Sequence, residues 1–172
     1  MSAALSMYQA SVPVFLRALQ NLHHVLEKGE AHARERGDDS AFLLQARLYE
    51  DMLPLVQQVQ RATDTAKFGV ARLAGVESPR FEDMETTFDE LYARLDAVAD
   101  YLRTFDEAAL QGSETRAVTL PTRAWGELHV DGGSYLLAFA LPNLFFHVTT
   151  AYAILRHHGV SLGKLDYLGP VA

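Results

Sequence analysis

Residues 136–155 limit most strongly what this chain can fold into, because they contain no charged side chain. Written as a helix, LLAFALPNLFFHVTTAYAIL carries apolar residues on almost every face, whereas a surface helix has one apolar stripe and one polar face. The stretch is long enough for a membrane span, but Asn143, His147 and two threonines argue against a lone span. We therefore predict a helix over residues 133–158 at the centre of a helical bundle, with no membrane partner.

Chain length and charge exclude several classes of protein. The 172 residues suit one domain, 1–172, with a full apolar core. The 22 acidic and 15 basic residues give a net charge of −7 with no basic run, which disfavours a nucleic-acid partner. The chain has no cysteine, so it has neither a disulfide nor a thiolate nucleophile. The first fifteen residues lack the basic and apolar regions of a signal peptide, so we predict a cytoplasmic protein.

Three amphipathic helices are predicted before the central helix, over residues 6–36, 52–74 and 87–105, with a short helical piece over 40–48. Apolar residues recur there every three or four positions, which places them on one stripe of each helix. The stripes are Val12, Phe15, Leu19, Leu22, Leu26 and Ala33 on the first helix, Leu55, Val59, Ala62, Ala66, Val70 and Leu73 on the second, and Phe88, Leu91, Leu95, Val98, Leu102 and Phe105 on the third.

Capping residues mark the expected ends of these helices. We expect the first helix to bend or restart near Pro13 with Ser11 as an N-cap, and the second to begin after Asp51. Thr87 and Glu90 have the spacing of a capping box at the start of the third. The expected C-cap glycines are Gly37, Gly75 and Gly159.

A small β-hairpin is predicted between the third and the central helix, with strands over 117–120 and 127–130, because apolar and polar residues alternate weakly there. Trp125 lies near its turn, where a packing role is the simplest interpretation. A lone hairpin is marginal in water, so this one should lie on the bundle.

The central helix should present one stripe to the bundle and further apolar residues elsewhere. The expected inward stripe is Leu137, Ala140, Leu144, Val148, Ala151 and Leu155. Phe145 and Phe146 should project onto the hairpin, the C-terminal tail or a second subunit. Phe68 falls nearly opposite the stripe of the second helix and indicates a second contact surface there. The tail after Val160 should pack against the bundle.

Known catalytic motifs are missing from the sequence. No two histidines are three or four residues apart, so no helix carries a self-contained metal motif. The pairs His23-His24 and His157-His158 are interpreted as surface residues near helix ends. The sequence has neither a GxSxG nucleophile elbow nor a phosphate-binding loop. Asp64 and Lys67 suit a solvated helix face better than a catalytic pair.

His147 differs from the other histidines because it lies in the least polar part of the chain. Asn143, His147 and Thr150 project from one flank of the central helix, beside its inward stripe. A buried histidine with a structural hydrogen bond is the simplest interpretation, a ligand-pocket role comes second, and a metal ligand comes third.

Three segments carry a resemblance to a known family: MYQASVPVFLRAL at 7–19, RLAGVESPRFEDMETTF at 72–88 and LPNLFFHVTTAYAILRHHGV at 141–160. The last is the most specific, together with Gly163-Lys164 and Asp166-Tyr167-Leu168-Gly169 after it. Over nearly its full length the chain resembles a mainly bacterial family known only as a domain of unknown function, grouped with the DinB-like proteins. The resemblance implies an all-α, DinB-like four-helix bundle, here with the small hairpin between helices 3 and 4.

Some DinB-like proteins are metal-dependent thiol transferases or hydrolases with three histidines around a divalent ion, one on the second helix and an HxxxH pair on the fourth. By resemblance, His147 matches the first histidine of the pair, but Ala151 stands at the second. Relatives often carry Asp-His-Ala-Lys where this chain has Asp64-Thr65-Ala66-Lys67. One imidazole cannot hold a catalytic zinc without other donors, so the resemblance does not carry the metal site over.

The leading hypothesis is a DinB-like bundle without a functional metal or other cofactor and with no assigned catalytic residue. We expect it to form a homodimer and to bind a small molecule. The candidate pocket residues are Thr65, Asn143, His147 and Thr150. The alternative is a divalent-metal-dependent transferase or hydrolase in which His147 and further donors hold an ion such as zinc or nickel. A third possibility is an interaction scaffold with no pocket.

Overall fold

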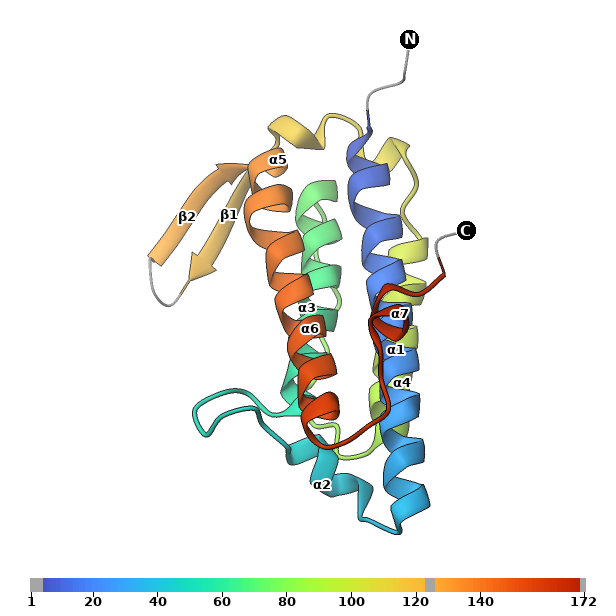
Figure 1. Ribbon diagram of the computed structural model, residues 1–172. Helices are drawn as coiled ribbons and strands as arrows, with labels where there is room; N and C mark the ends of the chain where they lie inside the picture. Colours follow the sequence, from blue (N-terminus) through green and yellow to red (C-terminus); the bar gives the residue numbers. More distant parts are fainter. Residues whose placement is uncertain (1–4, 123–125, 171–172) are drawn as a thin grey trace.

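Four long helices lie side by side in the computed structural model, which describes residues 5–122 and 126–170 (Figure 1). They are α1 (Met7–Arg36), α3 (Leu55–Ala74), α4 (Phe88–Arg103) and α6 (Leu141–His157). The shorter elements are α2 (Ser40–Gln45), η1 (Ala108–Leu110), η2 (Ser113–Thr115), β1 (Ala117–Thr122), β2 (Gly126–Asp131), α5 (Gly132–Tyr135), η3 (Leu136–Ala140) and α7 (Lys164–Leu168). The expected all-α four-helix bundle with a hairpin before its last long helix is confirmed.

The core lies between the long helices. Helix α6 packs on both α1 and α3, and helix α4 also packs on both α1 and α3. Every predicted stripe residue of α1 and α3 is buried, as is every one of α4 except the half-buried Phe105 beyond the helix end. Full burial of one such side chain contributes about 1.5–3 kcal/mol, so the stripes account for much of the favourable free energy of folding.

The start of α1 differs from the prediction. The helix is continuous through Pro13, and Ser6 is its N-cap, with Gln9 completing a capping box. Ser11 is fully buried, and its hydroxyl donates to the carbonyl oxygen of Met7 at 2.6 Å. It therefore lies within a continuous helix and is not the N-cap of a new one. Pro13 is the seventh residue of α1 and has no amide hydrogen, so one interior backbone hydrogen bond is lost while the helix continues.

The start of α3 also differs, since the helix begins at Leu55 and its N-cap position is Pro54. Asp51 lies in the preceding loop, which Arg47 holds by donating from Nη1 to the carbonyl oxygen of Met52 at 2.6 Å. The capping box of Thr87 and Glu90 on α4 is present as expected. The predicted short piece over 40–48 is shorter in the structure and ends at Gln45.

The central helix is interrupted by a wide turn, and this corrects one part of its predicted stripe. The segment η3 has π-helical backbone, with the Leu141 amide bonded to the Leu136 carbonyl, directly before Pro142. The wider turn rotates the residues before it relative to α6. Leu137, which was predicted to face the core, is therefore 66% exposed. Tyr135 and Leu136 are buried instead. The other stripe residues are buried as expected.

The hairpin pairs β1 and β2 in antiparallel register, with Val118 opposite Val130 and Leu120 opposite Leu128. Val118 and Leu120 are buried in the same apolar core as the helices, which attaches the hairpin to the bundle. The strands β1 and β2 project outward from the side of the helical bundle (Figure 1). Trp125 lies outside the described residues.

The C-terminal tail turns back after α6 and runs along α1 (Figure 1). Gly159 makes this reversal with φ +88°, and the amide of Val160 donates to the Leu155 carbonyl at 3.1 Å. These are the features of a Schellman C-cap with a buried hydrophobic follower, as predicted for Gly159 and Val160. The reversal places α7 against the middle of α1.

Candidate functional site

The predicted pocket residues lie at the contact between α3 and α6. The amide of Asn143 donates to the hydroxyl of Thr65 at 2.7 Å, and that hydroxyl donates to the carbonyl oxygen of Arg61. His147 follows one helical turn after Asn143. The hydroxyl of Thr150 donates to the Phe146 carbonyl within its own helix. The structure thus brings Asn143 and Thr65 together, with His147 beside them and Thr150 bonded separately.

His147 is held in one tautomer by Gln58. The side-chain amide of Gln58 donates to the carbonyl oxygen of Leu53 at 2.9 Å, which leaves its Oε1 to face Nδ1 of His147 at 2.8 Å. From this network, Nδ1 carries the proton. Burial, with a smaller effect from the positive charge of Arg61, lowers the pKa of His147 to about 4. The imidazole is therefore neutral at pH 7.

The residues at the three matching positions do not fit a three-histidine metal site. Thr65 and Ala151 replace two of the imidazoles, and the Thr65 hydroxyl is already bonded to Asn143 and Arg61. Nor does the described part of the chain contain a group of three or more His, Asp or Glu side chains placed to share an ion.

The remaining histidines lie elsewhere. His23 and His24 are in the middle of α1 and not near its end, as the sequence had indicated. His23 stacks on Tyr92 with ring centroids 4.6 Å apart. His158 follows the last turn of α6, and its Nδ1 lies 2.9 Å from the Ile154 carbonyl oxygen, which suits the negative end of the helix dipole.

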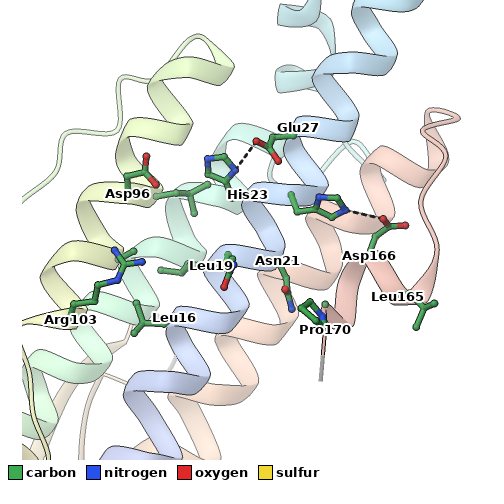
Figure 2. Close-up of a pocket in the computed structure, with 15 residues that line it drawn as sticks. Leu16, Leu19, Asn21, His23, Glu27, Asp96, Arg103, Leu165, Asp166 and Pro170 are labelled. Carbon is green, nitrogen blue, oxygen red and sulfur yellow. Dashed lines mark hydrogen bonds and ion pairs between the residues drawn. The ribbon is translucent and has the colours of Figure 1, made fainter. Parts of the chain in front are cut away.

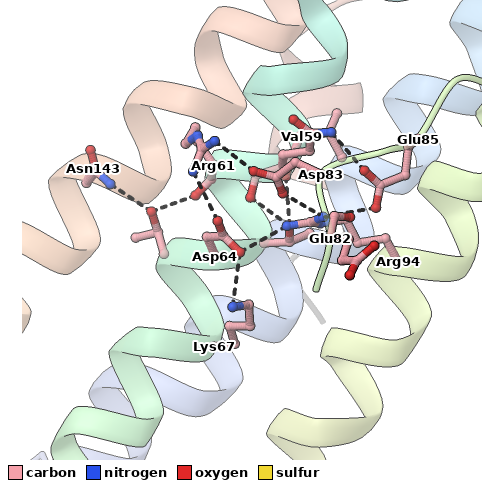
Figure 3. Close-up of polar contacts among 12 residues, drawn as sticks. Val59, Arg61, Asp64, Lys67, Glu82, Asp83, Glu85, Arg94 and Asn143 are labelled. Atoms are coloured by element: carbon pink, nitrogen blue, oxygen red, sulfur yellow. Dashed lines mark hydrogen bonds and ion pairs between the residues drawn. The ribbon is translucent and has the colours of Figure 1, made fainter. Parts of the chain in front are cut away.

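Asp64 and Lys67 correct another prediction, because they belong to a buried charge network and not to a solvated face (Figure 3). Lys67 and Arg94 are each only 2% exposed. Asp64 Oδ1 lies 3.1 Å from Lys67 Nζ and 2.9 Å from Arg94 Nη2. Arg61 approaches the other oxygen of Asp64 at 3.2 Å. Helical spacing alone could not reveal this, because the cover comes from α4 and from the loop after α3.

Two carboxylates of that loop complete the network. Arg94 Nη1 lies 2.9 Å from Glu85 and 3.0 Å from Asp83, and Arg94 Nε donates to Thr63 at 2.7 Å. Three cations thus meet three carboxylates, and the loop 76–87 is fastened to α3 and α4. All of these groups are paired with one another, which is typical of a structural clamp.

Phe68 takes part in the same region through its ring. Lys67 Nζ lies 3.7 Å from the Phe68 centroid and the guanidinium carbon of Arg72 lies 5.1 Å from it. The expected second contact surface at Phe68 is therefore occupied, at least in part, by cations of its own helix. Cation–π contacts of this kind are favourable where the cation is shielded from water.

A cavity of about 820 Å³ lies between α1, α4 and the C-terminal tail (Figure 2). Its apolar side chains are Leu16, Leu19, Leu95, Ala99 and Leu165. Its polar and charged side chains are Gln20, Asn21, His23, His24, Glu27, Asp96, Arg103 and Asp166. An apolar lining with a few polar groups is typical of a ligand pocket of this size.

A second cavity, of about 510 Å³, lies on the other side of the tail, between α1, α6 and α7. Arg17 and Phe145 line it from opposite helices, and Tyr167 and Leu168 from the tail. None of the four predicted pocket residues lines either cavity. The sequence did not reveal these cavities because both depend on where the tail lies.

The tail is fastened to α1 by residues of its segments Gly163-Lys164 and Asp166-Tyr167-Leu168-Gly169. Asp166 accepts hydrogen bonds from the Gly163 amide at 2.7 Å, from Lys28 at 2.9 Å and from His24 at 3.0 Å. These donors, led by the Gly163 amide, lower the pKa of Asp166 far below its usual range. The carbonyl oxygen of Leu168 accepts from Arg17 and Asn21. The tail is thus a defined wall of both cavities.

Comparison with known proteins agrees with this architecture. Residues 7–168 match the family model described as Domain of unknown function (DUF1993). A crystal structure of a DinB family member protein from Shewanella denitrificans is similar, with 42% sequence identity and a TM-score of 0.89 over 96% of this chain and 93% of that one. No curated protein matches. The expected DinB-like bundle is confirmed, and the chain belongs to the DUF1993 family.

Proposed function

We propose that this protein is a homodimeric helical bundle that binds a small molecule and has no functional metal site. The cavity of about 820 Å³ between α1, α4 and the tail carries this proposal. Its volume lies within the range of about 300–1,000 Å³ that is usual for ligand pockets. We propose a cytoplasmic location and no nucleic-acid or membrane partner, in keeping with the net charge of −7.

The cavity has features that would orient a ligand. Leu16, Leu19 and Leu95 supply apolar contact, while Glu27 and Asp96 stand on the two helices that flank it (Figure 2). Apolar contact supplies most of the affinity in such pockets, and a few polar groups supply orientation and specificity.

The cavity can be tested with a pair of variants on α4. Ala99→Phe puts a ring into the cavity, whereas Ala97→Phe puts the same ring on the exposed face of the same helix. We expect thermal-shift screening of a metabolite library to find compounds that stabilise the natural protein and Ala97→Phe but not Ala99→Phe. Equal stabilisation of both variants, or no stabilising compound at all, would contradict the proposal.

The exposed apolar surface of η3 and α6 supports the homodimer. No charged residue occurs between Ser134 and Ala153, and Leu137 of η3 and Phe146 of α6 are 66% and 57% exposed. By length and mean hydropathy of 1.4, the helix spanning 132–157 could also cross a membrane, a test that core helices of soluble bundles pass too. A second copy of the same face would cover these side chains symmetrically.

The alternative, a divalent-metal transferase or hydrolase, draws support from one observation. His147 is neutral at pH 7, and its Nδ1 proton is held by Gln58, as in metal-ligating histidines whose other nitrogen binds the ion. The missing donors at 65 and 151 weigh against it. Metal analysis of protein purified without a nickel column distinguishes the two, since about one zinc or nickel per chain, lost in His147→Ala, would overturn our preference.

A further inference from the structure

The cavity between α1, α6 and α7 contains one charged lining residue, Arg17, although the whole chain has a net charge of −7. Arg17 Nε and Nη2 donate to the carbonyl oxygen of Leu168 at 3.3 and 2.8 Å. A carbonyl is neutral, so these bonds hold the guanidinium in place without cancelling its charge. In the part of the chain that the structure describes, Arg17 forms no ion pair, and its Nη1 has no hydrogen-bond partner.

The rest of this cavity is largely apolar. Its apolar lining residues are Pro13, Val14, Ala18, Phe145, Val148 and Leu168. Phe145 is 38% exposed, so part of its ring faces water in the absence of an occupant. An apolar molecule in the cavity would cover this ring and the aliphatic side chains around it.

Gln9 offers a second donor at the cavity. Its Oε1 accepts from the Ser6 amide at 3.1 Å, which leaves its NH2 group to donate. Among the described residues this NH2 group has no acceptor. The Arg17 guanidinium by itself provides several N–H donors, which suit the two oxygens of a carboxylate, while Gln9 lies about two helical turns away on α1.

We propose that this second cavity binds an amphipathic monocarboxylic acid, with its carboxylate on Arg17 and its apolar body between α1 and α6. This inference deepens the ligand-binding part of the proposed function and rests on it. The first cavity suits such an acid less well, because Glu27, Asp96 and Asp166 line it. Its arginine, Arg103, already pairs with Asp100. Charge therefore directs an anion to Arg17.

Isothermal titration of the full chain at pH 7 with decanoate, decylammonium and 1-decanol tests this, since the three probes share one apolar chain. Decanoate should bind once per chain and at least about tenfold more tightly than the other two. Arg17→Gln should weaken decanoate about ten- to a hundredfold, the range expected for a lost charge-assisted hydrogen bond. Arg103→Gln removes the same charge beside the first cavity and should leave decanoate binding unchanged.

A second variant is needed because Arg17 also holds Leu168, so its loss can displace the tail. Val14→Glu places a carboxylate in the cavity without removing a tail contact. It should abolish decanoate binding while hydrogen exchange shows residues 163–169 still protected. Equal binding of the three probes, absence of decanoate binding, or full binding by Val14→Glu with the tail protected would each overturn the inference.

These outcomes are separable from failure of the proposed function. If decanoate does not bind but other compounds still distinguish Ala99→Phe from Ala97→Phe, the carboxylate inference is wrong and the ligand-binding function stands. If decanoate binds as described while the first cavity takes no compound, the inference stands and the first cavity is not the site.

Discussion

Nδ1 of His147 and Oε1 of Gln58 lie 2.8 Å apart across the contact between α3 and α6, so the only imidazole of α6's apolar stretch is held by an amide. His147→Leu should leave the Gln58 oxygen without its donor and cost about 1–3 kcal/mol in the free energy of unfolding. The double variant with Gln58→Leu should recover part of that loss, because neither partner is then unpaired. Urea unfolding at pH 7 measures both; a double variant no more stable than His147→Leu would contradict the pairing.

The same histidine should make stability depend on pH. Its pKa is about 4 in the folded protein against 6.5 for a free histidine, so the unfolded chain binds more protons between these values. The free energy of unfolding should therefore fall as the pH drops from 6.5 to about 4, by at most about 3 kcal/mol from this group. His147→Leu should lose this part of the dependence. Unfolding curves at pH 7, 5.5 and 4.5 give the measurement, with surface His129→Leu as the control.

Arg94 should be among the most sensitive positions in the charge network. Arg94→Leu removes the cation that joins Asp64, Asp83 and Glu85, and breaking a buried pair in this way costs about 3–5 kcal/mol. Arg103→Leu is the matched control, since its pair with Asp100 is mostly exposed and should contribute no more than about 1 kcal/mol. Equal losses in the two variants by chemical denaturation would mean that the network does not act as a clamp.

Two glycines with positive φ but different ψ, +19° at Gly37 and −177° at Gly169, should respond differently to alanine. Gly37 and Gly169 have φ of +69° and +66°, but a Cβ at Gly37 meets nothing, whereas one at Gly169 would overlap Oδ1 of Asn21. Gly37→Ala should cost about 1 kcal/mol through backbone strain alone. Gly169→Ala should also displace the tail, and hydrogen exchange of 163–169 should rise only there. If hydrogen exchange of residues 163–169 were unchanged in Gly169→Ala, this would contradict the close packing of the tail against Asn21.

The dimer proposal predicts the effect of charge on the exposed apolar surface of η3 and α6. The natural protein should scatter light as a particle of about twice its 19.1 kDa chain mass at micromolar concentration. Leu137→Asp combined with Phe146→Asp should give monomers, because burying unpaired carboxylates is costly. Tyr49→Asp alters a side chain that is 69% exposed in the loop between α2 and α3 and should leave the mass unchanged. A natural protein that is monomeric would refute the dimer.

The sequence predicted the parts of this fold that repeat regularly. The stripes of α1, α3 and α4 follow from apolar spacing, and the caps at Gly37, Gly75 and Thr87 follow from local chemistry. Leu137 was misplaced because a π turn changes the helical period, which counting in steps of 3.6 residues does not detect.

The candidate site was harder to predict because it depends on packing between distant segments. The sequence predicted that Asp64 and Lys67 lie on a solvated face, but in the structure the loop 76–87 covers them. Asn143 and His147 were grouped with Thr65 as pocket candidates, and Asn143 does bond Thr65, but Gln58, the partner of His147, has no sequence signature. Both cavities arise only when α7 returns to α1, far from it in sequence. The family resemblance identified the fold and, through Thr65 and Ala151, argued against a three-histidine site.

The tail segment 163–169 forms a wall shared by two cavities whose lining charges differ. Ligand binding in one cavity is therefore thermodynamically coupled to ligand binding in the other. If ligands in both cavities favour the packed position of the tail, each raises the affinity of the protein for the other. The two affinities rise by the same factor, since such linkage is reciprocal. An acid bound at Arg17 would thus change the affinity of the neighbouring cavity for its ligand. The reverse titration, with the ligand of the neighbouring cavity bound first, would give the same ratio of affinities for the acid.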